Sequence, residues 1–67
     1  MDEGVIEYRD RGGNEKRRPL PRARDVFDYP ESYPEARLPG AQIKTQGTVY
    51  WYDRHGQLRH RDRGRDE

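Results

Sequence analysis

The stretch Ile43-Lys44-Thr45-Gln46-Gly47-Thr48-Val49-Tyr50-Trp51-Tyr52 decides the fold, because its residues alternate as a half-buried strand requires. One face of this strand would carry Ile43, Thr45, Gly47, Val49 and Trp51, and the other Lys44, Gln46, Thr48, Tyr50 and Tyr52. Asp53-Arg54-His55-Gly56 follows, with the Asp first and Gly fourth that favour a type I turn closed by a left-handed glycine. Residues 57–62 return as the partner strand, so a β-hairpin is predicted over residues 43–62.

A two-stranded hairpin is only marginally stable in water, so a further strand must complete it. Val5-Ile6-Glu7-Tyr8 has the β-branched and aromatic content of a short strand, and Gly12-Gly13-Asn14 favours a turn after it. A strand from another molecule, added at the edge, is the other way to complete the hairpin, and strand addition between copies would make the protein oligomeric. We therefore predict a small all-β fold with a C-terminal β-hairpin or three-stranded antiparallel sheet.

The remainder of residues 1–42 is predicted to be a long, extended, proline-punctuated N-terminal arm. Pro19 and Pro21 remove two amide donors and favour extended backbone. A tandem repeat follows, Tyr29-Pro30-Glu31-Ser32 and Tyr33-Pro34-Glu35-Ala36, which favours polyproline II with its aromatic rings splayed. The domain organisation is then an arm over residues 1–42 with a short strand at 5–8, a hairpin over 43–62 and a charged tail over 63–67.

The composition limits what chemistry the chain can perform. Of 67 residues, 28% are hydrophobic and 40% are charged, and only nine are Leu, Ile, Val or Phe, below the share that usually builds a core. With no cysteine there is no disulfide or thiolate metal site. His55 and His60 lie near Asp53 and Asp62, but neighbouring arginines disfavour a bound cation. We expect a protein that is not an enzyme, with no catalytic residues, no metal and no cofactor.

No run of about 18 apolar residues is present, and the start Met1-Asp2-Glu3 lacks the basic and apolar regions of a secretory signal. The sequence therefore predicts a protein of the cytoplasm or of a macromolecular assembly, without a signal peptide and without a membrane partner.

Charge is segregated although the net charge is only +1. Residues 9–24 hold seven basic and two acidic residues, whereas residues 25–36 hold four acidic residues and no basic one. A second basic ladder alternates through residues 59, 61, 63 and 65, which share one face if they form a strand. The candidate basic patch comprises Lys16, Arg17, Arg18, Arg22, Arg24, Arg59 and Arg61. It could contact nucleic acid, dock on an acidic protein surface or simply remain solvated.

Aromatic side chains are the candidate partner-binding residues. Tyr50, Trp51 and Tyr52 alternate between two faces, so a monomer of this size cannot bury all three on one face. Trp and Tyr are enriched at interface hot spots, although Trp51 can equally anchor the core. Tyr29 and Tyr33 are predicted to dock because an extended segment has little core to pack into. The candidate set is Tyr29, Tyr33, Tyr50, Trp51 and Tyr52.

The string Tyr50-Trp51-Tyr52-Asp53-Arg54-His55-Gly56-Gln57-Leu58, with Asp62 four residues on, resembles one Tyr-Asp repeat of RHS and teneurin-type proteins. The resemblance covers residues 47–62, about a quarter of the chain, and Tyr8-Arg9-Asp10-Arg11-Gly12 echoes it with the acid displaced by one position. Such repeats are β-hairpins that stack in dozens to form a shell. The resemblance implies hairpin geometry here, while the shell and its contents do not carry over to a chain with at most two copies.

These observations predict a small non-enzymatic interaction or assembly protein, such as an accessory or virion-type structural component, whose arm orders on a larger protein partner. The alternatives are a nucleic-acid-associated basic protein and an inhibitor that presents Asp25, Asp28, Glu31 and Glu35 as a nucleic-acid mimic.

Overall fold

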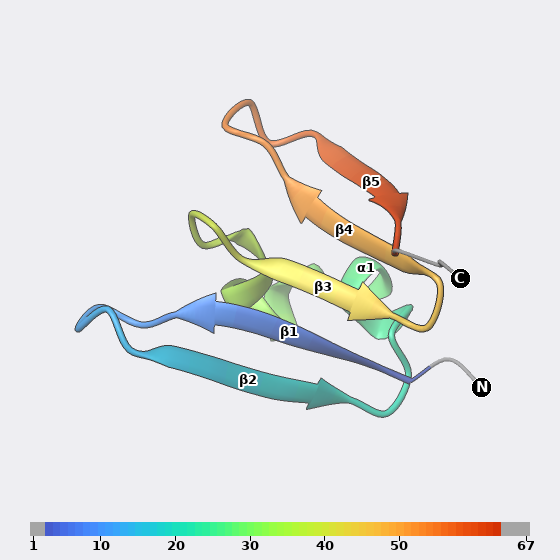
Figure 1. Ribbon diagram of the computed structural model, residues 1–67, viewed down its shortest axis with the longest axis horizontal. Helices are drawn as coiled ribbons and strands as arrows, with labels where there is room; N and C mark the ends of the chain where they lie inside the picture. The colour runs from blue at the N-terminus through green and yellow to red at the C-terminus, as the bar shows by residue number, and fades with distance from the viewer. Residues whose placement is uncertain (1–2, 64–67) are drawn as a thin grey trace.

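The computed structural model describes residues 3–63 and contains one five-stranded antiparallel sheet with the strand order β2-β1-β3-β4-β5 (Figure 1). The strands are β1 (Gly4–Arg9), β2 (Glu15–Leu20), β3 (Gln42–Thr45), β4 (Thr48–Tyr52) and β5 (Leu58–Asp62). Between β2 and β3 the chain forms α1 (Asp25–Asp28) and two 3-10 helices, η1 (Pro30–Ser32) and η2 (Pro34–Arg37). Residues 21–41, the covering segment, lie behind the sheet in Figure 1. Of the predicted charged tail, residues 64–67 lie outside the described residues.

The predicted long N-terminal arm is wrong, because residues 4–20 form a hairpin that belongs to the sheet. All six residues of β1 pair with β2, and β1 also pairs with β3. Pro19 lies within β2 and is compatible with this pairing because of the direction in which its nitrogen points. The Asp10 N–H donates to the Asn14 carbonyl, so Asn14 and every second residue after it direct their backbone groups toward β1. The backbone groups of residues 15, 17 and 19 therefore point away from β1. A proline on the outer side of an edge strand sacrifices no ladder bond.

The predicted single strand over residues 43–52 is also corrected, since it is two strands joined at Gln46 and Gly47. Ile43 pairs with Tyr50 and Lys44 pairs with Val49 across this turn. The Thr45 hydroxyl donates to the Thr48 carbonyl at 2.9 Å and accepts from the Thr48 N–H at 3.2 Å. In a two-residue connection, residues three apart share a face, so the alternation is inverted after the turn. Tyr50 and Tyr52 therefore join Ile43 on one face, and Val49 and Trp51 point to the other.

The tandem Tyr-Pro repeat forms two 3-10 turns instead of the expected polyproline II segment. Tyr29 and Tyr33 have nearly the same backbone, with φ of −129° and −134° and ψ of 65° and 60°. In each copy a proline opens the helix, where its fixed φ fits and its missing N–H has no bond to lose. The repeat in sequence is thus a repeat in structure, and it folds the chain across the sheet.

The hydrophobic core lies between the sheet and the covering segment. The two isoleucines Ile6 and Ile43 are fully buried at its centre, and partly buried aromatic rings enlarge it. The buried cluster is Ile6, Leu20, Ala23, Val26, Ala36 and Ile43, and the rings are those of Tyr8, Phe27, Tyr33, Tyr50 and Tyr52. Tyrosines and alanines therefore supply the apolar surface that the few aliphatic residues lack.

Replacing Ile43 should test this core. Ile43→Ala removes a fully buried side chain from the middle strand, so we expect a loss of about 2–5 kcal/mol in the free energy of unfolding, measured by urea denaturation. Leu38→Ala is the matched control, because Leu38 is 39% exposed and its truncation should cost less than about 1 kcal/mol. Equal losses for the two variants would contradict the assigned core.

Candidate functional site

The sheet has one covered face and one open face, and the pairing register assigns each strand residue to one of them. The row Arg18, Ile6, Ile43, Tyr50 and His60 lies on the covered face. The neighbouring row Pro19, Val5, Lys44, Val49 and Arg61 lies on the open face. Among residues 3–63 no helix or strand lies over the open face (Figure 1).

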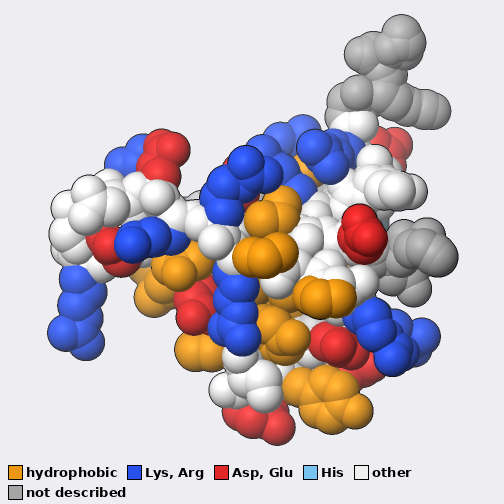
Figure 2. All heavy atoms as spheres, turned by 90° about the horizontal axis from the view of Figure 1, so that it is seen from below, with side chains coloured by type: hydrophobic (Ala, Val, Ile, Leu, Met, Phe, Trp, Pro, Cys, Tyr) orange, Lys and Arg blue, Asp and Glu red, His pale blue; other side chains and the backbone are white. Residues whose placement is uncertain are grey.

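The open face is mainly cationic. Its strand positions carry five cationic side chains against two carboxylates; the cations are Arg9, Arg17, Lys44, Arg59 and Arg61, and the carboxylates are Glu7 and Glu15. In Figure 2, Lys and Arg side chains gather along the upper margin, on the side of the sheet away from the covering segment. The acidic covering segment and the basic open face thus lie on opposite sides of the sheet.

Trp51 is the large aromatic side chain of the open face. Its cross-strand partner is Arg59, and it borders a shallow hollow of about 170 Å³ together with Gln42 and Arg61. Val49, two residues before it, is only 2% exposed although no described element covers it. Its cross-strand partners are Lys44 and Arg61, whose aliphatic stems can cover apolar surface. The result is a small apolar centre surrounded by positive charge.

The other predicted partner-binding aromatics lie elsewhere. Tyr50 packs edge-on against Phe27 with ring centroids 5.1 Å apart, and the Arg37 guanidinium lies 4.5 Å from the centre of the Tyr52 ring. Tyr33 packs on the core beneath Arg18, at 4.4 Å. Tyr29 is 56% exposed on the covering segment. The structure therefore separates Trp51 from the four tyrosines, three of which pack on the core.

The predicted basic residues do not form one patch. Arg17, Arg59 and Arg61 share the open face, whereas Lys16 and Arg18 are on the covered face and Arg22 and Arg24 are in the covering segment. The ion pairs are Arg17–Glu7 at 3.7 Å, Lys16–Asp10 at 4.0 Å, Arg18–Glu35 at 2.7 Å, Arg24–Asp28 at 3.5 Å and Arg59–Asp53 at 3.6 Å. Arg22 and Arg61 make no ion pair with another residue of 3–63.

Lys44 and Glu7 are functional candidates that the sequence analysis did not identify. The Lys44 ammonium lies 2.9 Å from the Glu7 carboxylate, which also faces Arg17 at 3.7 Å. Assigning Lys44 required the pairing of β1 with β3, which joins residues far apart in the chain.

The acidic block of residues 25–36 is partly neutralised, since Glu35 pairs with Arg18 and Asp28 pairs with Arg24.

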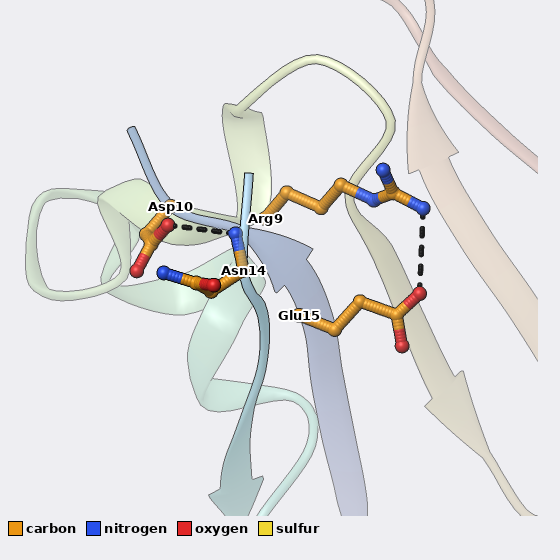
Figure 3. A network of polar contacts seen from close by, with 4 residues as sticks. All are labelled: Arg9, Asp10, Asn14 and Glu15. Atoms are coloured by element: carbon orange, nitrogen blue, oxygen red, sulfur yellow. Dashed lines mark hydrogen bonds and ion pairs between the residues drawn. The ribbon is translucent and has the colours of Figure 1, made fainter. Parts of the chain in front are cut away.

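The two hairpin turns have the same construction. Asp10 accepts the N–H groups of Gly12 and Asn14 at 2.9 and 3.0 Å, and Asp53 accepts those of His55 and Gln57, both at 2.9 Å. Gly13 and Gly56 close the turns with φ of 81° and 80°, where a side chain would be strained. Figure 3 shows the first turn, with Asp10 bonded to Asn14 and with Arg9 facing Glu15 at 3.3 Å.

The twin turns share a seven-residue pattern, Asp-Arg-x-Gly-(Asn or Gln)-x-(Lys or Arg), which starts at Asp10 and again at Asp53. In both copies the cation at the seventh position faces the first carboxylate. When Tyr8 is aligned with Tyr52 or Tyr50, the acidic residues of the two segments do not coincide. When Asp10 is aligned with Asp53, the two turns match in structure as well as in sequence. Bonds from the backbone N–H of Asn14 and of Gln57 are the main cause that lowers the pKa of Asp10 and of Asp53 below the ordinary value.

In the part of the chain that the structure describes, no three His, Cys, Asp or Glu side chains are grouped as metal ligands. No helix within residues 3–63 is long and apolar enough to cross a membrane. Comparison with protein-family models, with curated proteins and with solved structures finds no match. The likeness to a Tyr-Asp repeat therefore stays a prediction about family, while β4 and β5 do form the hairpin that it implies.

Acidification should weaken both turns. Because the folded pKa of Asp10 and of Asp53 lies below the unfolded value of about 3.9, their contribution is fully present above that pH and is lost as pH falls through the folded pKa. We expect the melting temperature to decrease when the pH is lowered below about 4. In carboxyl NMR titrations, the midpoints of both residues should lie below the ordinary pKa of an aspartate. Asp10→Asn combined with Asp53→Asn should flatten this dependence; an unchanged acid limb in the double variant would contradict the assignment.

Proposed function

We propose that this chain is a small non-enzymatic interaction protein that docks its open sheet face on an acidic surface of a larger protein or assembly. The observation that carries the proposal is the position of Trp51. The inverted alternation after Gln46 and Gly47 directs this side chain away from the core and places it beside Arg59 and Arg61. A partly exposed tryptophan gains most from being covered by a partner, and Trp is among the side chains most enriched at hot spots.

Electrostatics supports an acidic partner. The five cations of the open-face strands exceed its two carboxylates, and Arg61 makes no ion pair with another residue of 3–63. Complementary charge raises the association rate and sets the orientation of docking, while the partly exposed ring of Trp51 supplies apolar contact area.

The docking surface is already built in the folded chain. Ordering of an arm on the partner is not part of the proposal, because residues 4–20 lie in the sheet and the covering segment packs on the core. A preformed face loses less conformational entropy on binding than an extended arm would.

A second candidate is binding of single-stranded nucleic acid on the same face. The observation that favours it is the placement of Trp51 beside Arg59 and Arg61, since an aromatic ring among cations can stack a base while the cations meet phosphates. Glu7, in the middle of the face, opposes a polyanion, and the net charge of the chain is only +1.

Trp51 is the only tryptophan of the chain, so its fluorescence reports directly on the open face. We expect an acidic peptide of alternating Glu and Val to change this fluorescence at low salt, and the same peptide with Lys for Glu to leave it unchanged. Titration with oligo-dT tests the second candidate, which requires binding that weakens steeply as salt rises. No response to either probe would contradict the proposed function.

Two variants locate the binding surface. Arg61→Ala should weaken binding of the acidic peptide by at least about fivefold, or about 1 kcal/mol, because Arg61 lines the same hollow as Trp51 and carries a positive charge without an ion pair in the described range. Arg22→Ala is the matched control, since Arg22 is exposed, likewise without an ion pair in the described range, and lies off the open face. Equal affinities of the two variants would place the interaction elsewhere on the molecule.

A further inference from the structure

The sheet ends in two edge strands, β2 and β5, whose outer backbone groups have no partner among residues 3–63. In an antiparallel ladder the backbone groups of alternate residues point inward and outward. The bonds from the Asp53 N–H to the Gln57 carbonyl and from the Arg63 N–H to the Gly47 carbonyl fix this alternation for β5. They direct the backbone groups of Leu58, His60 and Asp62 outward.

The two edges differ in what they offer to an incoming strand. On β2 the outward positions are Glu15, Arg17 and Pro19, and the proline has no N–H to donate. On β5 all three outward positions have an N–H, and every residue of the strand is exposed. A proline at an edge is a common means of preventing strand addition. The β5 edge therefore offers an incoming strand the longer uninterrupted run of outward N–H groups.

A second copy of this chain is a poor occupant of the β5 edge. When two β5 strands pair antiparallel with their open faces on the same side, a register centred on His60 places Arg59 opposite Arg61 of the other copy. Registers centred on Arg59 or on Arg61 place each of these residues opposite itself. Like charges directly opposite one another destabilise a sheet. Pairing of two β5 edges is therefore disfavoured by repulsion between arginines, whereas a strand that carries carboxylates at these positions is favoured.

We propose that the β5 edge is a strand-addition site for an extended segment of an acidic partner protein, which alternates acidic and apolar residues. This inference rests on the proposed function and identifies how the partner is held. Acidic side chains would lie on the open face opposite Arg59 and Arg61, with Arg59 between the added strand and Trp51. Apolar side chains would lie on the other face next to Leu58, which is 43% exposed. The main chain of the segment bonds to the outward groups of Leu58, His60 and Asp62.

The test uses a proline at an outward position of β5. His60→Pro removes one outward N–H but none of the bonds to β4, because Arg59 and Arg61 make those, and Pro19 shows that the other edge accepts a proline in the same orientation. His60→Ala is the matched control, since it deletes the same ring and keeps the N–H. We expect the peptide of alternating Glu and Val to bind the His60→Ala variant like the wild type and the His60→Pro variant at least about tenfold more weakly, by Trp51 fluorescence.

Amide hydrogen exchange on the wild-type protein gives a second readout that does not depend on the proline variant folding. The N–H groups of Leu58, His60 and Asp62 should exchange fast in the free chain and slowly with the peptide bound. Those of Arg59 and Arg61 face β4 and should be protected in both states.

The outcomes separate the two proposals. A fluorescence response that is equal in the His60→Pro and His60→Ala variants, with no new protection at the edge, overturns strand addition and leaves docking on the open face intact. No response of the wild type to the peptide overturns both. Protection of the three edge amides by oligo-dT instead of the peptide overturns the acidic-segment assignment.

Discussion

The two-residue turn at Gln46 and Gly47 decides which side chains of the middle strands reach the core. Because Thr45 and Thr48 oppose each other across it, held by the bonds of the Thr45 hydroxyl, the turn brings Tyr50 to the face of Ile43. A connection longer or shorter by one residue would exchange the two faces of β4, burying Trp51 and exposing both tyrosines. The composition of the core, the composition of the open face and the environment of Trp51 therefore all depend on the number of residues in this turn.

Local signals in the sequence predict the Asp turns, whereas the Tyr-Pro repeat, expected to be polyproline II, forms two 3-10 turns. The Asp53 turn is predicted correctly because its side chain bonds to backbone N–H groups within four residues and Gly56 supplies the positive φ. The twin turn at Asp10 was recognisable from the same pattern. The face of the sheet on which Trp51 lies was not predictable from alternation alone. A two-residue turn between two strands leaves the sequence looking like one alternating strand, yet it exchanges the two faces after the turn.

The wrong prediction of an N-terminal arm has a different cause. Charged residues and prolines in residues 15–20 fit an exposed arm, yet the same composition fits an edge strand, where outward groups meet water and a proline nitrogen needs no partner. The pairing of Val5 with Lys44 joins distant segments and leaves no local signal. The basic residues show the same limit: their alternation predicts the shared face of Arg59 and Arg61, but the distribution of the others between two faces depends on the full sheet order.

The charge blocks along the chain are redistributed by the fold, so that the open face of the sheet has an excess of cations while basic and acidic residues are mixed on the covered side. The acidic block lies in the covering segment, where Arg18 holds Glu35. On the open face the cations outnumber the carboxylates, and Arg61 makes no ion pair with another residue of 3–63. The measurement that tests this account most directly is the set of NOE contacts of the Trp51 indole ring in the free protein. The account requires contacts to the side chains of Arg59 and Arg61 and none to Ile43 or Val26. Contacts from the indole to Ile43 and Val26, with the Tyr50 ring exposed to solvent, would contradict it.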